Sequence, residues 1–268
     1  MKSNSTTKSA STSLVLLFRL IAANDWQQLK DMFLSDPEGA KTFQYLAALV
    51  AKSSSYNGMT ILHACAHARF NPPAVLINRM IELCPDAPSS QDCLNRTPLH
   101  VAAGTGASSA VIKVFVDSYP DACMIQDKDG RTPLHMACDS SCELFEDNTR
   151  GRTQRPSPSY RTIAVLLSAS LNSAILEDDD GLNAIEHALC SNADLQTVQL
   201  IQRAAQNVML KKHEEERANK AKGQVSNKFI AAATKGFSQQ ESPRRLVCLV
   251  LHRHDHLLLH SAEIYCRR

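Results

Sequence analysis

Residues 97–103 read TPLHVAA and residues 132–138 read TPLHMAC, so the chain contains the same short motif twice. A looser copy, TILH, occupies residues 60–63. The steps from Thr60 to Thr97 and from Thr97 to Thr132 are 37 and 35 residues long. A motif that returns at such a period indicates a repeat architecture, in which each repeat is one supersecondary unit that stacks on its neighbours.

Each letter of the motif has a physical role at the start of a short helix. Threonine is a favourable N-cap, because its hydroxyl accepts the backbone N–H three residues further on. Proline at the first helical position loses no hydrogen bond. The leucine is expected in the core, and the histidine can bond the backbone of the neighbouring turn. We therefore assign a structural role to Thr60, Leu62, His63, Thr97, Pro98, Leu99, His100, Thr132, Pro133, Leu134 and His135.

A fourth unit starts at Asn183, after an insertion has lengthened the third. Asn183 is a good cap, and Glu186 stands where a capping box places its acidic residue. This unit lacks the histidine of the motif. Turn-forming pairs precede the four starts, at Asn57-Gly58, Leu94-Asn95, Asp129-Gly130 and Asp180-Gly181.

A second helix is predicted in each unit, because apolar residues recur there at helical spacing. Pro85 and Pro120 end two of these helices. The four predicted segments are 72–87, 108–122, 160–174 and 193–205.

In these features residues 60–206 resemble the ankyrin repeat family, whose units open with this motif and repeat at this period. The resemblance implies an all-α fold, an ankyrin-repeat solenoid of stacked helix–turn–helix units with short β-turn tips. It also implies that the chain binds another protein.

The expected organisation has three parts, of which the first is a disordered N-terminal tail at 1–13. The second is the stack at 14–213. Its parts are an opening cap at 14–56, an extra helix at 45–52, repeats from 60, 97 and 132, an inserted loop at 140–160 and a closing unit at 183–213. Residues 214–268 are predicted to form a charged helix, then a linker at 222–244, then a histidine-rich tail.

The composition excludes several classes of protein. A net charge of +2 over 268 residues gives no reason to expect a nucleic-acid partner. The apolar run from Leu14 is interrupted at Arg19, so it is too short for a signal-peptide core or a membrane span. Nine scattered cysteines favour reduced thiols in a cytoplasmic or nuclear protein.

No catalytic or cofactor motif is found in the sequence. The acidic run 177–180 is interpreted as a turn, because it lacks the spaced ligands of a Ca²⁺ loop. The tail contains His252, His254, His256 and His260, so a metal-responsive role is kept as a weaker hypothesis. We otherwise expect no enzyme activity, no cofactor, no metal and no membrane partner.

The binding surface is expected along the turns and the ends of the first helices, where side chains need not enter the core. Tyr56, Arg96 and Arg131 are predicted to contribute most of the binding energy, because tyrosine and arginine are common anchors of interfaces. The acidic fourth turn is expected to set orientation and association rate. The full set is Tyr56, Asn57, Met59, His67, Cys93, Leu94, Arg96, Lys128, Asp129, Arg131, Asp139, Asp178, Asp179 and Leu182.

Two functions remain open at this point. The first is a non-catalytic interaction module, an adaptor or scaffold. The alternative is a regulatory subunit or a fragment of an enzyme, such as a kinase or ubiquitin ligase, whose catalytic domain lies elsewhere.

Overall fold

The computed structural model describes residues 3–68, 72–141 and 157–235, with side chains from 11 to 220 within those ranges. All regular secondary structure in these ranges is helical, and the only bridge is an isolated antiparallel one between Glu177 and Asn183. The all-α prediction is therefore confirmed. The chain divides into two compact parts after Leu210, and each part is described by itself.

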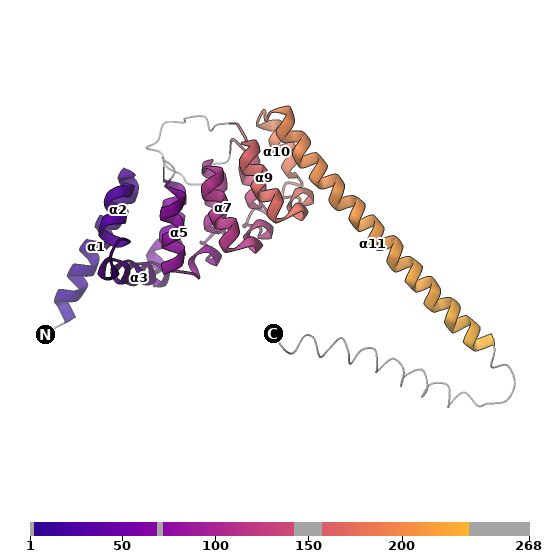
Figure 1. Cartoon of the computed structure of the whole chain (residues 1–268), viewed down its shortest axis with the longest axis horizontal. Helices are drawn as coiled ribbons and strands as arrows, with labels where there is room; N and C mark the ends of the chain where they lie inside the picture. Colours follow the sequence, from indigo (N-terminus) through magenta and orange to yellow (C-terminus); the bar gives the residue numbers. More distant parts are fainter. Residues whose placement is uncertain (1–2, 69–71, 142–156, 236–268) are drawn as a thin grey trace. The chain divides into compact units, whose positions relative to one another are not determined.

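The first compact part opens with three helices, α1 (Ser3–Ala23), α2 (Trp26–Phe33) and α3 (Pro37–Lys52) (Figure 1). Asp25 caps α2 by accepting the backbone N–H of Gln28 at 3.0 Å, as its position in the sequence indicates. The disordered tail expected at 1–13 is wrong for residues 3–13, which belong to α1. No glycine or proline stands in that stretch to end a helix that begins from buried residues further along.

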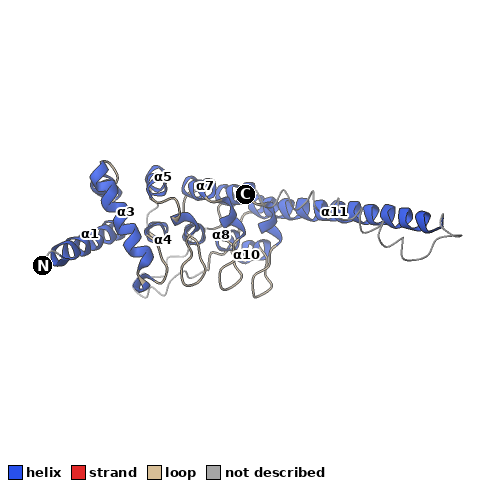
Figure 2. Cartoon of the chain, turned by 90° about the horizontal axis from the view of Figure 1, so that it is seen from below, coloured by secondary structure: helices blue, strands red, loops and turns tan. Residues whose placement is uncertain are grey.

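Four repeat units follow, each with an inner helix next to the turns and an outer helix behind it. The inner helices are α4 (Ile61–His67), α6 (Pro98–Thr105), α8 (Pro133–Cys138) and α10 (Ala184–Cys190). The outer helices are α5 (Ala74–Leu83), α7 (Ser109–Ser118), α9 (Tyr160–Ala169) and the first part of α11 (Leu195–Lys235). Figure 2 shows the inner helices between the outer helices and the turns.

Short 3₁₀ helices complete the connections. Three of them follow outer helices and lead to the next turn, and one precedes the first turn. They are η1 (Ser54–Tyr56), η2 (Ala87–Ser89), η3 (Pro120–Met124) and η4 (Leu171–Ile175).

The core lies between the inner and outer rows. Leu99 and Leu134, the leucines of the two full motifs, are each only 1% exposed. Ala102 and Ala103 are buried where α6 lies between α4 and α8. Their small side chains let these neighbouring helices approach closely. The outer helices α5, α7 and α9 pack in sequence along the other side of the core.

The structure bears on two of the predicted connections. The insertion does lie between the inner and outer helices of the third unit, since α8 ends at Cys138 and α9 begins at Tyr160, but 142–156 lie outside the described residues. The linker predicted from residue 222 is wrong as far as Lys235, where α11 ends. One glycine, Gly223, does not interrupt a helix that otherwise contains good helix formers.

The histidine-rich tail, to which the weaker metal-responsive hypothesis refers, lies outside the described residues. None of the helices in the described ranges combines the length and the apolar character that crossing a bilayer requires.

Candidate protein-binding surface

Each of the last three turns is organised by an aspartate five residues before the cap. In the second unit, Asp92 Oδ1 accepts the backbone N–H groups of Leu94 and Arg96, both at 2.9 Å. Asp127 and Asp178 make the corresponding pair of bonds in the third and fourth units. These bonds fix the turn backbone before any partner arrives, so the exposed side chains stand on a preorganised support.

A backbone hydrogen bond also joins each turn to the one before it. The donor N–H and acceptor carbonyl are Cys93 and Asn57 at 2.7 Å, Lys128 and Leu94 at 3.0 Å, and Asp179 and Asp129 at 3.1 Å. Gly130 permits the last of these contacts, because a Cβ atom there would lie 2.7 Å from the backbone nitrogen of Asp179. The turns therefore form one continuous row.

The motif histidines connect one unit to the next. His135 Nδ1 accepts the backbone N–H of Thr132 at 3.1 Å, so the ring proton is on Nε2 and is donated to the carbonyl of Leu176 at 3.1 Å. His63 and His100 make the equivalent bonds to the second and third units. Burial lowers the pKa of His100 and of His135 to about 4, which keeps both rings neutral. The structural role predicted for these histidines matches this geometry.

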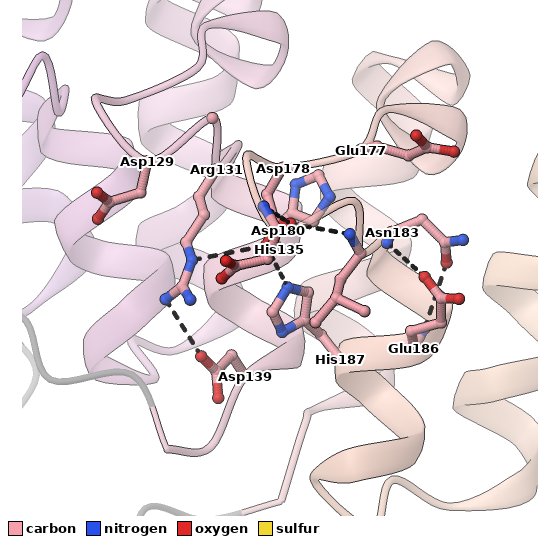
Figure 3. Close-up of polar contacts among 12 residues, drawn as sticks. Asp129, Arg131, His135, Asp139, Glu177, Asp178, Asp180, Asn183, Glu186 and His187 are labelled. Atoms are coloured by element: carbon pink, nitrogen blue, oxygen red, sulfur yellow. Dashed lines mark hydrogen bonds and ion pairs between the residues drawn. The ribbon is translucent and has the colours of Figure 1, made fainter.

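The fourth unit contains a histidine after all, one position later than the motif places it. His187 Nε2 lies 2.8 Å from Asp178 Oδ2, and both side chains are buried. Arg131 approaches the same carboxylate, with Nε 3.7 Å from Asp178 Oδ2, while its Nη1 lies 3.4 Å from Asp139 Oδ2 (Figure 3). Burial alone would raise the pKa of Asp178, but hydrogen bonds from His187 and the backbone of Leu182 hold it below its usual value.

Three residues assigned to the binding surface are buried, which corrects the sequence analysis. They are Arg96, Asp139 and Asp178. Arg96 Nη2 lies 2.7 Å from Asp92 Oδ2, and the side chains of both residues are 5% exposed or less. Arg96 therefore serves its own turn and cannot be the interface anchor that its residue type suggested. Asp139 accepts hydrogen bonds from Arg131 and Ser141 within the third unit, whereas Asp178 lies between Arg131 of the third unit and His187 of the fourth.

Four further residues from the predicted surface are half-buried, namely Tyr56, Met59, His67 and Arg131. The Tyr56 ring stacks on Phe18 of α1, with a centroid distance of 5.4 Å and an interplanar angle of 26°. This contact ties the first turn to the opening helices and leaves only part of the ring for a partner.

The remaining seven predicted residues are exposed. They are Asn57, Cys93, Leu94, Lys128, Asp129, Asp179 and Leu182. Glu177 and Asp180 are exposed beside them. We call these nine residues the turn surface. Its second turn is uncharged, whereas four of its five charged side chains, at the third and fourth turns, are acidic.

Sequence reasoning missed the residues that hold the turns in place, Asp92, Asp127 and His187. The two aspartates could have been found, because each stands five residues before a motif threonine and four residues before an arginine. His187 carries no such signal, since its displacement by one position removes it from the alignment of the motifs.

Within the ranges that carry described side chains, no three His, Cys, Asp or Glu residues gather as a metal site would require. The comparisons with known proteins indicate a repeat family instead. Residues 68–146 match the family model of ankyrin repeats in three copies. Among curated proteins, none matches the chain.

Proposed function

We propose that the chain, whose residues 68–146 match the ankyrin repeat family, is a non-catalytic adaptor that binds another protein through the turn surface. Ankyrin repeats are in general protein-binding modules. The observation that supports the turn surface as a binding site is that buried and exposed residues of the last three turns have separate roles. Asp92, Asp127 and Asp178 hold the backbone from inside, and the side chains next to them point to solvent.

The proposed partner segment is chemically graded along the row of turns. Leu94 is 40% exposed and offers an apolar contact at the second turn. Asp179, Asp180 and Glu177 are exposed at the fourth turn and favour basic groups there. Exposed charges of this kind act mainly on the association rate and on orientation, whereas the apolar contact contributes to the lifetime of the complex.

We place this activity in the cytoplasm or the nucleus. Six described cysteines, Cys93 and Cys190 among them, are free thiols, and two of these are exposed. Free, exposed thiols are more common in a reducing compartment than in a secreted protein.

The test is a comparative pull-down from cells, read by quantitative mass spectrometry. One bait is the full chain, and the second carries Leu94→Ser, Asp179→Asn and Asp180→Asn on the turn surface. The control bait carries Lys113→Gln and Asp117→Asn, which remove an exposed ion pair on the outer helix α7. A partner retained by the control and lost at least tenfold by the turn variant supports the proposal. Equal recovery by all three baits would overturn it.

The same experiment separates the two functional classes. A kinase or a ubiquitin ligase that is recovered in fixed stoichiometry, and whose activity changes on addition of this chain, would favour the regulatory subunit. A partner without such activity is the outcome expected for an adaptor.

A further inference from the structure

A groove lies at the start of the row of outer helices, before α5. α5 packs directly on α7, and α7 on α9, whereas residues of α2 and α5 line a groove of about 560 Å³. Trp26, Leu34 and Leu76 are among the residues that line it. This volume lies within the range of about 300–1,000 Å³ that is usual for ligand-binding clefts.

Trp26, one of the residues that line the groove, contains a buried hydrogen-bond donor. Trp26 Nε1 is shielded from solvent, and among the described residues it has no hydrogen-bond acceptor. Nearly all buried polar groups in proteins are satisfied, and leaving one unpaired is costly. A ligand that supplied an oxygen to this N–H would remove that cost.

The rest of the lining combines buried leucines with exposed polar and charged side chains. Leu34 and Leu76 are each 4% exposed, whereas Val75 is 78% exposed at the edge. On the α5 side, Glu82 is occupied, because it accepts hydrogen bonds from Arg79 at 2.9 Å and from Asn78 at 2.8 Å.

On the α2 side, Asp31 accepts hydrogen bonds from Gln27 at 3.0 Å and is not one of the residues that line the groove. Lys30 lines the groove and forms no ion pair with any described residue. Among the residues that line the groove, Lys30 and Arg79 are basic and Glu82 is acidic, so the net charge of the lining is positive.

We propose that the groove binds an acidic, apolar peptide segment of a partner protein. A leucine-like side chain would pack on Leu76 and Val75, a backbone carbonyl would accept from Trp26 Nε1, and a carboxylate would pair with Lys30. This site belongs to the outer helices and is separate from the acidic turn surface, which would repel the same peptide. The chain would thus hold two segments of opposite charge at once.

The experiment uses the intrinsic fluorescence of Trp26, which is the only tryptophan in the chain. The full chain is titrated with the peptide acetyl-Glu-Leu-Leu-Leu-Glu-amide. The controls are the same peptide with lysine in place of glutamate, and one with serine in place of leucine. The expected result is a saturable change in emission with the acidic apolar peptide, at a concentration at least tenfold below either control. No saturable change, or equal binding of the lysine peptide, would overturn the proposal.

Two variants test the assigned contacts by calorimetry. Trp26→Phe keeps an aromatic ring but removes the N–H, and Lys30→Gln removes the charge from an exposed position. Each should weaken binding of the acidic peptide at least fivefold, whereas Lys113→Gln on α7 should leave it unchanged. Thermal melting confirms that Lys30→Gln is folded, so that its result stands even if Trp26→Phe is unstable. Unchanged affinity in folded Lys30→Gln would show that this groove is not the site.

Discussion

His187 bonds the aspartate of its own turn, with Nε2 2.8 Å from Asp178 Oδ2, whereas the histidines of the first three units bond the following unit. The fourth unit is the last in the row of turns that the structure describes. Its N3 position is occupied by Glu186, which accepts the backbone N–H of Asn183 at 2.7 Å. The histidine, one residue later, stabilises the buried Asp178 carboxylate from within the unit.

Replacing His187 should therefore destabilise the fold. His187→Ala leaves a buried carboxylate oxygen without its hydrogen bond, and we expect a loss of about 1–3 kcal/mol in the free energy of unfolding. Urea denaturation at neutral pH measures it. His213→Ala, at an exposed position of α11, is the control and should change the free energy by less than about 0.5 kcal/mol. Equal values for the two variants would contradict the assignment.

Arg96 and Arg79 provide a matched pair of arginine–carboxylate contacts that differ in burial. Arg96→Ala leaves the Asp92 carboxylate buried and unpaired, so it should cost about 3–5 kcal/mol. Arg79→Ala breaks an exposed pair with Glu82 and should cost about 0–1 kcal/mol. Chemical denaturation of both variants decides between this interpretation and the alternative that Arg96 is an exposed binding residue. In the alternative, the two variants would unfold at similar denaturant concentrations.

Leu99→Ala and Leu134→Ala should each destabilise the stack by roughly 2–5 kcal/mol, because each truncation leaves a cavity between packed helices. Leu94→Ala changes the same residue type at a position that is 40% exposed, and serves as the control. Melting temperatures of the three variants check the prediction. A shift for Leu94 as large as those for the two motif leucines would show that burial is not the cause.

Gly130 and Gly181 have the same conformation but different surroundings. Their φ angles are +72° and +75°, so an alanine is strained at either site by roughly 1 kcal/mol. Only at position 130 would the new Cβ collide with the next turn, 2.6 Å from Asp179 Oδ1, whereas nothing lies within 4 Å at 181. Gly130→Ala should therefore unfold at a clearly lower urea concentration than Gly181→Ala. Equal midpoints would mean that the stacked turns separate at little cost.

Acidification should weaken the stack through its neutral histidines. Burial lowers the folded-state pKa of His100 and His135 to about 4, whereas an unfolded histidine titrates near 6.5. Between those values the unfolded chain binds protons that the folded chain does not, so stability is full above the unfolded pKa and falls as the pH falls. From pH 7.5 to pH 5 we expect a loss of about 2 kcal/mol per histidine.

Urea denaturation across that pH range measures the slope. His135→Gln removes one of the buried titrating histidines, so its stability should depend less steeply on pH than that of the unmodified chain. A slope that is the same in both proteins would refute the assignment to His135.

The sequence by itself determined the units and their helix starts. Thr132 caps α8, Pro133 begins it and Asn183 caps α10, because caps and first turns depend on contacts three or four residues apart. The exposed turn residues Leu94, Asp129 and Asp179 followed from the same alignment.

Only the tertiary structure decided which polar side chains face the interior. Arg96 was expected at the surface because side chains that flank a turn need not enter the core, but its guanidinium donates to Asp92 inside the turn. The role of His187 and the groove beside Trp26 also depend on how whole helices pack. The physical reason is distance along the chain. Burial results from contacts between repeat units, such as the approach of Arg131 to Asp178, and no local spacing in the sequence encodes them.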